Sequence, residues 1–476
     1  MKITDLSPRL LSAEYAVRGP IVNRAQELEK SGRKIIYCNV GNPHALGQKP
    51  LTYIRQVLSI VEYPELLNRH EAGKIYPSDV INKAVYILSH MPHGTGAYTQ
   101  SPGMSFIREA VAEFIRKRDG IPAEAGNIIL TDGASKGVQA VLTALLRNSS
   151  DGVMIPVPQY PLYSASIELY GAKQIRYYLD EENSWQLNEN ILEESITKAS
   201  NNGINPVAIA VINPGNPTGA VLSYDNIQMI IDFALRHNLA IMADEVYQDN
   251  IYAEGKAFHS FAKVMYNSGI NNVPLFSFHS VSKGYTGECG HRGGYLEIRN
   301  VPQDVMDQFI KLQSINLCAN TAGQIITYLL VSPPEEGDES YELFIKERDY
   351  ILNEMKQKAE IIGKELSKID GIEIEIPEGA MYAFVKIELP HTRDISSMTE
   401  EEKLDYESSR DSDYCMALLE ETGICVVPGS GFGQLPGTLH FRTTILPSRE
   451  EITEMVSLIE DFHKRYIQNL KSKSVA

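Results

Sequence analysis

Two periods of apolar residues alternate along the middle of the chain. Between about residues 104 and 300, short apolar runs alternate with segments whose apolar residues recur every three or four positions. Runs of the first kind predict buried strands, and segments of the second kind predict amphipathic helices. Apolar strands between helices indicate a mostly parallel sheet with both faces covered. We predict strands within 127–133, 152–158, 206–219, 239–247, 274–284 and 293–298, and helices over 105–120, 136–146 and 226–238.

A smaller α+β unit is predicted toward the C-terminus. Residues 333–340 form a polar connector, and a long charged helix is expected over 341–368. Strand patterns follow, and the acidic, polar stretch 391–412 among them is expected to be an exposed excursion; these strands lie at 372–379, 380–389, 424–433 and 439–446. We therefore expect an α/β protein with an N-terminal arm that packs on the small domain and forms part of it (1–70), a large domain (71–332) and a C-terminal small domain (333–476). The arm includes an amphipathic helix predicted over 21–34.

The charge balance excludes two kinds of partner. The chain carries 44 Lys and Arg against 61 Asp and Glu, which gives a net charge of −17 over 476 residues. Binding to nucleic acid or to an anionic membrane surface rests on clustered cations, so neither is expected. No run approaches the ~20 apolar residues of a membrane span. The first residues also lack the apolar core of a signal peptide.

Cysteine and histidine usage gives no metal site. The five cysteines are sparse and form no C-x-x-C pair, so neither a disulfide framework nor a zinc ribbon is predicted. His90 and His93 lack a third ligand at metal spacing and are interpreted as structural. The chain does not end in a peroxisomal S-K-L type signal. We therefore expect a cytoplasmic protein without a metal.

Lys283 is the first candidate for chemistry. It follows an apolar strand pattern, Ser280 and Ser282 precede it, and Arg292 lies nine residues further on. A lysine amine condenses with aldehydes, while hydroxyls and an arginine fork bind a phosphate dianion. Such a turn suits a phosphorylated aldehyde cofactor, and the alternative is a surface lysine after a strand. Cys289, although it lies close by in sequence, is assigned no role.

Two further predicted strands end in polar side chains. Asp244 ends one of them, Tyr247 follows three residues later, and Asn216 lies in the turn 213–219 after another. A carboxylate beside a pyridine nitrogen keeps that nitrogen protonated. The phenol and the amide could reach an oxygen on the same ring. The alternatives are a helix-capping Asp with a packed Tyr, and ordinary turn chemistry.

The remaining candidates are a glycine-containing turn and a strand arginine. Residues 133–137 lie between a strand and a helix, where free N–H groups bind phosphate and Ser135 adds a hydroxyl; a simple helix cap is the alternative. Arg442 lies in a strand pattern, where its fork suits a carboxylate unless an intramolecular ion pair occupies it. Residues 429–433 do not fit G-x-G-x-x-G and are expected to form a flexible loop beside the site.

Six motifs follow one another along the chain: GASKG (133–137), PQYP (158–161), NPGNPTG (213–219), DEVY (244–247), SVSKG (280–284) and HFR (440–442). In this order, the motifs resemble those of the class I/II pyridoxal-phosphate aminotransferases of fold type I. The resemblance covers nearly the whole chain, and within the class the chain looks most like the alanine aminotransferases. It implies a large domain with a seven-stranded, mostly parallel sheet between helices, a smaller α+β domain, and pyridoxal 5′-phosphate as the cofactor.

The resemblance also implies roles for the residues around the cofactor. Lys283 matches the lysine that binds the cofactor aldehyde, and Asp244 matches the partner of the pyridine nitrogen. Tyr247 and Asn216 match the donors to the ring oxygen, and Tyr160 matches the aromatic side chain stacked on the ring. The residues that match the phosphate ligands are Ala134, Ser135, Lys136, Ser280, Ser282 and Arg292.

Substrate and subunit contacts are implied in the same way. Arg442 matches the arginine that binds the substrate α-carboxylate; Gly41 matches the glycine near that carboxylate, and Asn216 is expected to contact the substrate. Tyr98 looks like the tyrosine that reaches the phosphate of the neighbouring subunit, which implies a homodimer with shared sites. Arg18 is the one candidate for the arginine that selects dicarboxylic substrates.

The implied activity is transamination between L-alanine and 2-oxoglutarate by a ping-pong mechanism, giving pyruvate and L-glutamate. The same chemistry with another pair, such as glutamate and glyoxylate, stays open, as do decarboxylation and γ-elimination on this fold. A non-catalytic, cofactor-binding regulator is a different class. It would need an added DNA-binding unit and a basic patch, which the sequence does not contain.

Overall fold

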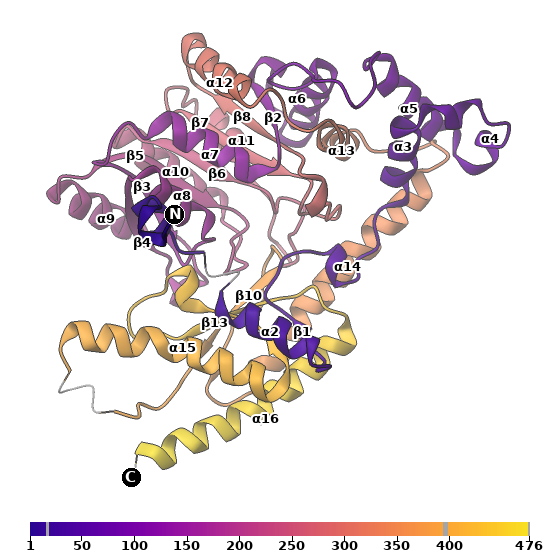
Figure 1. The fold of residues 1–476 in the computed structure, drawn as a ribbon. Coiled ribbons are helices and arrows are strands. Elements are labelled where there is room, and N and C mark those ends of the chain that lie inside the picture. Colours follow the sequence, from indigo (N-terminus) through magenta and orange to yellow (C-terminus); the bar gives the residue numbers. More distant parts are fainter. Residues whose placement is uncertain (16–18, 394–397, 475–476) are drawn as a thin grey trace.

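A seven-stranded mixed sheet forms the centre of the larger part of the protein (Figure 1). The computed structural model describes residues 1–15, 19–393 and 398–474. All strands of the sheet run in one direction except β8, which is antiparallel to both of its neighbours. The strand order is β2 (Ile128–Thr131), β8 (Gly294–Arg299), β7 (Leu275–Ser280), β6 (Ala240–Asp244), β5 (Asn205–Ile212), β3 (Asp151–Val157) and β4 (Lys173–Tyr178).

Helices cover both faces of this sheet, as the apolar strand runs predict. Alternate residues of β5 belong to different cores: Ala208 and Ala210 pack with helices on one face, and Ile209 and Val211 pack on the other. These helices and their neighbours are α6 (Ser105–Asp119), α7 (Ala134–Leu145), α8 (Leu162–Tyr170), α9 (Glu189–Asn201), α10 (Tyr224–Arg236), α11 (Phe261–Asn267), α12 (Gln303–Ile315) and α13 (Thr321–Val331). Burial on both faces of the sheet therefore explains why consecutive positions of these strands are apolar.

A four-stranded antiparallel sheet lies in the smaller part of the protein (Figure 1). Its order is β12 (Val427–Pro428), β13 (His440–Thr444), β10 (Tyr382–Ile387) and β9 (Ile372–Glu373). The N-terminal strand β1 (Ile36–Tyr37) pairs in parallel with β11 (Ile424–Cys425), so a segment from the first tenth of the sequence pairs with one near its C-terminal end. The helices of this region are α2 (Pro20–Lys30), α14 (Tyr341–Leu366), α15 (Glu400–Thr422) and α16 (Arg449–Ser474).

The remaining N-terminal elements join the two parts. A short helix, α1 (Pro8–Ser12), packs near α8, and α14 extends from α3 toward the small sheet (Figure 1). The other helices are α3 (Thr52–Glu62), α4 (Ala72–Ile75) and α5 (Ser78–Ser89). Within the described ranges no helix combines the length and the apolar character needed to cross a membrane.

Two expectations about the small unit are wrong. The stretch 391–412 is not an exposed excursion throughout, because α15 begins at Glu400 and its Asp411 is fully buried, accepting hydrogen bonds from Ser430. Residues 429–433 are not a loose loop, because Gly429–Phe432 form a 3-10 turn, η9, with Phe432 1% exposed. In both cases a buried tertiary contact orders a segment whose composition is typical of loops.

Candidate active site

Three candidate residues meet at one edge of the large sheet because their strands are parallel neighbours. β5, β6 and β7 lie side by side, with Ile212 opposite Asp244 and Asp244 opposite Phe278. Asn216 follows β5, Asp244 ends β6, and Lys283 follows β7. The carboxyl ends of parallel strands are where open α/β sheets bind ligands.

Lys283 points toward the N-terminal segment. Its Nζ donates a hydrogen bond to the Gly41 carbonyl oxygen at 2.7 Å and lies 5.9 Å from the centre of the Tyr247 ring. Gly41 has no room for a side chain, because a Cβ there would stand 1.8 Å from Tyr382 Oη and 3.2 Å from Lys283 Nζ. The lysine amine and the Tyr382 hydroxyl therefore converge on Gly41.

Asp244 is buried with one oxygen unpaired. Its Oδ2 accepts a hydrogen bond from Tyr163 Oη at 3.0 Å, while Oδ1 has no partner among the described residues. Burial raises the pKa of Asp244 to about 6, although Tyr163 and the Lys283 charge oppose the shift. A buried oxygen without a partner is costly, so this atom is suited to a cationic N–H donor from a ligand.

Asn216 links the ring-oxygen candidates to the strand arginine. Its Nδ2 donates to Tyr247 Oη at 3.5 Å, and its Oδ1 accepts from an Arg442 NH1 at 3.2 Å. Burial raises the pKa of Tyr247 well above its ordinary value. Burial also tends to raise the pKa of Tyr382, but the charges of Lys283 and Arg442 outweigh it and lower that pKa.

Arg442 is buried without a carboxylate partner in the described part of the chain. The residue is 1% exposed, its guanidinium carbon lies 4.1 Å from the Tyr382 ring centre and 4.6 Å from that of Phe432, and NH2 donates to the Asn39 carbonyl at 2.5 Å. Its Nε has no partner among these residues. The intramolecular ion pair considered as an alternative does not form within them, so the guanidinium is available for a carboxylate ligand.

The phosphate candidates surround the start of α7. Gly133 caps this helix with φ 81°, and a Cβ there would stand 2.3 Å from an Arg292 NH2. Arg292 donates to Ser282 Oγ at 3.2 Å and to the Asp132 carbonyl at 2.9 Å. The Ser280 hydroxyl accepts from the Ser282 N–H at 3.3 Å. Ser135, Lys136 and Arg292 line a hollow of about 710 Å³ beside the helix N-terminus, and Ala134 is the first residue of the helix.

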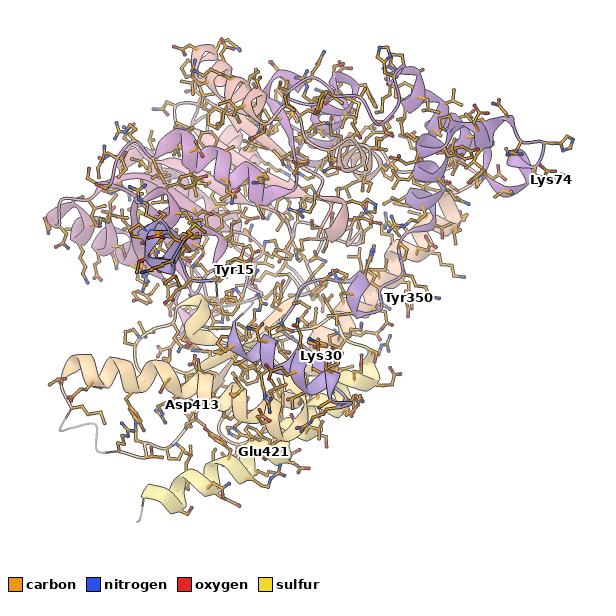
Figure 2. All side chains as sticks on the ribbon, in the orientation of Figure 1. Tyr15, Lys30, Lys74, Tyr350, Asp413 and Glu421 are labelled. Carbon is orange, nitrogen blue, oxygen red and sulfur yellow. The ribbon has the colours of Figure 1, made fainter. Side chains whose placement is uncertain are left out.

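The remaining candidates are Tyr160, Tyr98, Arg18 and the two histidines. Tyr160 shares a hydrogen bond of 2.7 Å with Tyr15, a residue of the N-terminal arm that is labelled in Figure 2. Tyr98 is 79% exposed, and Arg18 lies outside the described residues. His90 contacts the Tyr86 carbonyl at 2.9 Å and packs on the Phe106 ring, a structural arrangement. His93 lines a surface hollow around Tyr98.

Sequence reasoning missed three side chains of this site. Tyr163 contacts Asp244, while Tyr382 and Phe432 lie against the Arg442 guanidinium. Tyr382 is found within a predicted strand, and the β10–β13 register places its neighbour Phe384 opposite Arg442. The strand pattern could have identified Tyr382 as a buried phenol, but nothing in the spacing indicates which residue it faces.

The sequence profile of the family described as "Aminotransferase class I and II" matches residues 67–459. The chain therefore belongs to the class I and II aminotransferases, which use pyridoxal 5′-phosphate. It is 44% identical over 482 residues to "Alanine aminotransferase 2, mitochondrial" of Arabidopsis thaliana, covering 99% of this chain and 88% of the relative. It is 45% identical over 466 residues to "Glutamate--glyoxylate aminotransferase 2" of the same organism, covering 97% and 96%.

Solved structures confirm the expected fold. "Alanine aminotransferase from Pyrococcus furiosus" superposes with a TM-score of 0.77 at 26% identity, over 97% of this chain and 100% of the other. The predicted family, fold class and cofactor are thus confirmed. The residues fit the cofactor, because the unpaired Asp244 Oδ1 suits a protonated pyridine and the start of α7 beside Arg292 suits a phosphate.

Proposed function

We propose that this transaminase moves an amino group between L-alanine and 2-oxoglutarate, giving pyruvate and L-glutamate. One observation supports substrates that carry an α-carboxylate. Arg442 is a buried guanidinium with no carboxylate partner among the described residues, and it belongs to the same contact network as Asn216 and Tyr247. The names of the relatives support alanine as the donor. Ping-pong kinetics follow, because the first keto acid leaves before the second binds.

The side chains of the site divide the tasks of the proposed mechanism between them. When bound, pyridoxal phosphate supplies an electron-withdrawing pyridine ring. Lys283 would hold the cofactor through its aldehyde. Its free Nζ would take the proton from the substrate Cα and would return it to Cα when the second keto acid is converted to its amino acid. Asp244 would keep the ring nitrogen protonated, and Tyr247 and Asn216 would donate hydrogen bonds to the ring oxygen. Arg442 orients the substrate through its carboxylate, with Gly41 and Asn216 at the same end.

The remaining assignments hold the cofactor in place. We assign Tyr160 to the face of the ring. We assign the phosphate to Ala134, Ser135, Lys136, Ser280, Ser282 and Arg292. The high exposure of Tyr98 suits a contact with a second copy of the chain, and we propose a homodimer in which Tyr98 reaches the partner's phosphate site. The proposed division of the chain is 1–70, 71–332 and 333–476, and the β1–β11 pairing supports grouping the N-terminal arm with the small domain. A cytoplasmic location stays a prediction, since one relative is named as mitochondrial.

A donor and acceptor panel tests the substrate pair. We expect kcat/KM for L-alanine with 2-oxoglutarate to exceed that for L-glutamate with glyoxylate by about tenfold or more, the size of effect that one or two pocket contacts produce. The alternative pair is retained because a glutamate–glyoxylate aminotransferase is as similar to this chain as the alanine enzyme is. If kcat/KM is instead higher for L-glutamate with glyoxylate, that pair replaces L-alanine with 2-oxoglutarate as the proposed substrates. No transamination of any pair by protein saturated with pyridoxal phosphate would contradict the proposal as a whole.

Arg442→Lys should weaken use of amino-acid substrates selectively. A lysine cannot make the two parallel hydrogen bonds of an arginine fork, so we expect kcat/KM for L-alanine to fall by about 10²-fold. An amine without a carboxylate, such as ethylamine, should be used equally poorly by both proteins. Arg108→Lys is the control, because the hydrogen bonds of Arg108 in the described part of the chain go to Gly103, Ala125 and Gln100. Equal losses for both substrates would remove the carboxylate role.

A further inference from the structure

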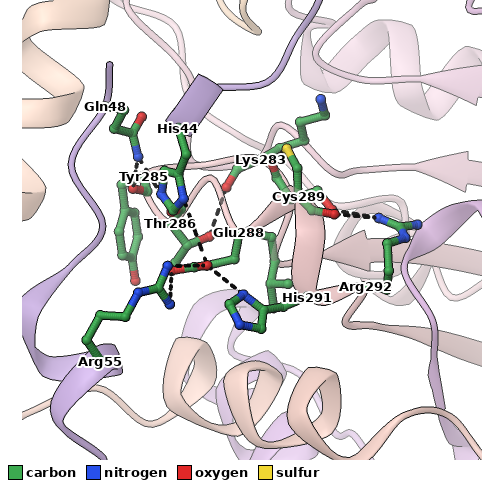
Figure 3. A network of polar contacts seen from close by, with 12 residues as sticks. His44, Gln48, Arg55, Lys283, Tyr285, Thr286, Glu288, Cys289, His291 and Arg292 are labelled. Atoms are coloured by element: carbon green, nitrogen blue, oxygen red, sulfur yellow. Dashed lines mark hydrogen bonds and ion pairs between the residues drawn. The ribbon is translucent and has the colours of Figure 1, made fainter. Parts of the chain in front are cut away.

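Glu288 is a deeply buried carboxylate to which the proposed mechanism gives no task. It lies five residues after Lys283, directly before η7 (Cys289–His291), and is 1% exposed. Its two oxygens each lie 3.0 Å from a nitrogen of the Arg55 fork, and Oε2 also lies 2.9 Å from His291 Nδ1 and 4.0 Å from His44 Nδ1 (Figure 3). Arg55 belongs to α3 and His44 to the turn η3 (His44–Leu46), so Glu288 joins three segments.

The turn that carries Lys283 is closed by hydrogen bonds within residues 281–288. The Glu288 N–H donates to the Val281 carbonyl at 2.8 Å, and the Gly287 N–H donates to the Lys283 carbonyl at 3.3 Å. Thr286 Oγ1 donates to the Val281 carbonyl at 2.7 Å. These bonds do not involve the Glu288 side chain, so the turn can keep its shape without that carboxylate.

The N-terminal segment 41–55, in contrast, is held to the turn by side chains. His44 Nε2 donates to the Thr286 carbonyl at 3.1 Å, and Gln48 Nε2 donates to the Tyr285 carbonyl at 3.0 Å (Figure 3). A Cβ on Gly287 would stand 2.9 Å from Gln48 Nε2, so the two segments touch closely. The Arg55–Glu288 pair is the charged contact at the far end of this segment, and Gly41 is its first residue.

We propose that Glu288 is a positioning residue, whose ion pair with Arg55 fixes segment 41–55 against the Lys283 turn and thereby sets the position of Gly41. This inference rests on the proposed function, in which Gly41 lies near the substrate carboxylate and Lys283 transfers the Cα proton. Without the ion pair, Gly41 shifts while the Lys283 turn keeps its backbone bonds. Substrate binding therefore suffers more than the proton transfer does.

Glu288→Gln in the cofactor-loaded enzyme tests this division. We expect the KM values for L-alanine and for 2-oxoglutarate to rise about tenfold, with kcat within about threefold of the wild-type value. Arg55→Met should have the same effect. The KM values of the double variant should be no higher than those of either single variant, because both substitutions break the same Arg55–Glu288 ion pair. Hydrogen exchange of residues 41–48 in the cofactor-free protein should be faster in all three variants than in wild type.

Glu347→Gln is the matched control. Glu347 holds the start of the same helix, α3, through the Thr52 N–H at 2.9 Å and Thr52 Oγ1 at 2.5 Å, and no described contact joins it to the Lys283 turn. It should lower the melting temperature without changing either KM. If Glu288→Gln does not fold, Arg55→Lys takes its place and should raise both KM values by about threefold, since lysine keeps the charge but not the fork.

The outcomes separate this inference from the proposed function. Borohydride reduction of the loaded wild-type enzyme, followed by peptide mapping, places the cofactor on Lys283 if the proposed function holds. Cofactor mapped to another lysine contradicts that function. With Lys283 labelled, unchanged KM values and unchanged hydrogen exchange in the Glu288 and Arg55 variants overturn the positioning role, as does an equal effect of Glu347→Gln.

Discussion

Lys283→Ala is expected to lower kcat with L-alanine by about 10³-fold or more, since a positioned general acid–base group contributes on this scale. The Lys283 Nζ donates to the Gly41 carbonyl at 2.7 Å and lies 5.9 Å from the Tyr247 ring centre. An alanine methyl group can neither bind the cofactor aldehyde nor take up the Cα proton. Because Lys283 is only partly buried, the truncation removes little core packing and the fold should persist. Steady-state kinetics of the variant measure the loss of kcat, and its melting temperature shows whether the fold persists.

Chemical rescue distinguishes a lost amine from a damaged site. A small amine such as methylamine, added at high concentration, should raise the rate of Lys283→Ala, because it supplies the missing base within the space that the side chain vacates. Lys311→Ala, at an exposed position on α12, should behave as wild type with or without the amine. A wild-type rate in Lys283→Ala would contradict the mechanism.

The residues at strand ends could be predicted from the sequence because each sits at a fixed offset from an apolar run. Asn216, Asp244 and Lys283 follow β5, β6 and β7, and parallel pairing of these strands brings the three together. The direction of β8 could not be predicted in this way, because a strand buried on both faces has the same apolar pattern in either direction. The proposed cofactor residues could thus be found from local signals in the sequence, whereas the order and direction of the strands could not.

Contacts between segments that are distant in sequence could not be predicted from the apolar pattern. Tyr382 reaches Gly41 and Arg442 because β10 pairs with β13 and the N-terminal segment runs beside β13, where the Thr444 N–H donates to the Cys38 carbonyl at 2.9 Å. Tyr163 reaches Asp244 from the first turn of α8, 81 residues earlier. A buried phenol looks like any other core aromatic residue in a sequence, so its partner becomes evident only from the fold.

The error at α15 has a different cause, since a local signal was present. Thr399 and Glu402 form a capping box: the Thr399 hydroxyl accepts from the Glu402 N–H at 3.3 Å, and the Glu402 carboxylate accepts from the Thr399 N–H at 2.9 Å. The pattern T-x-x-E before a helical segment is a helix-start signal. The acidic composition of 391–412 outweighed it in the prediction. Acidity does not prevent a helix, however, and the Glu402 carboxylate lies in the first turn, at the positive end of the helix dipole.

Asp244→Asn is expected to act in opposite directions on the reaction and on the cofactor-free protein. In the loaded enzyme, an amide cannot hold the positive charge on the ring nitrogen as a carboxylate does, so kcat should fall by about 10²-fold or more. The Tyr163 hydroxyl, which donates to Asp244 Oδ2 at 3.0 Å, can donate equally to the asparagine oxygen. The site should therefore keep its geometry, and bound cofactor should still be detected by its visible absorbance. An unchanged kcat would remove Asp244 from its proposed role.

In the cofactor-free protein the same substitution should be stabilising, with a defined pH dependence. Burial raises the pKa of Asp244 to about 6 in the folded state, against about 4 in an unfolded chain. Below about pH 4 the carboxyl is protonated in both states, so asparagine gives no advantage. Between the two pKa values the folded wild type holds a proton that the unfolded chain has lost, so its stability falls as the pH rises. Above about pH 6 the folded protein bears the full cost of the buried charge, up to about 3 kcal/mol, and Asp244→Asn avoids it.

Urea unfolding of both cofactor-free proteins at pH 4 and pH 8 measures the difference in the free energy of unfolding. Cofactor binding should remove the advantage at pH 8, because a protonated ring nitrogen gives the buried carboxylate its missing partner. An equal difference at both pH values would show that packing, and not the charge at position 244, is responsible.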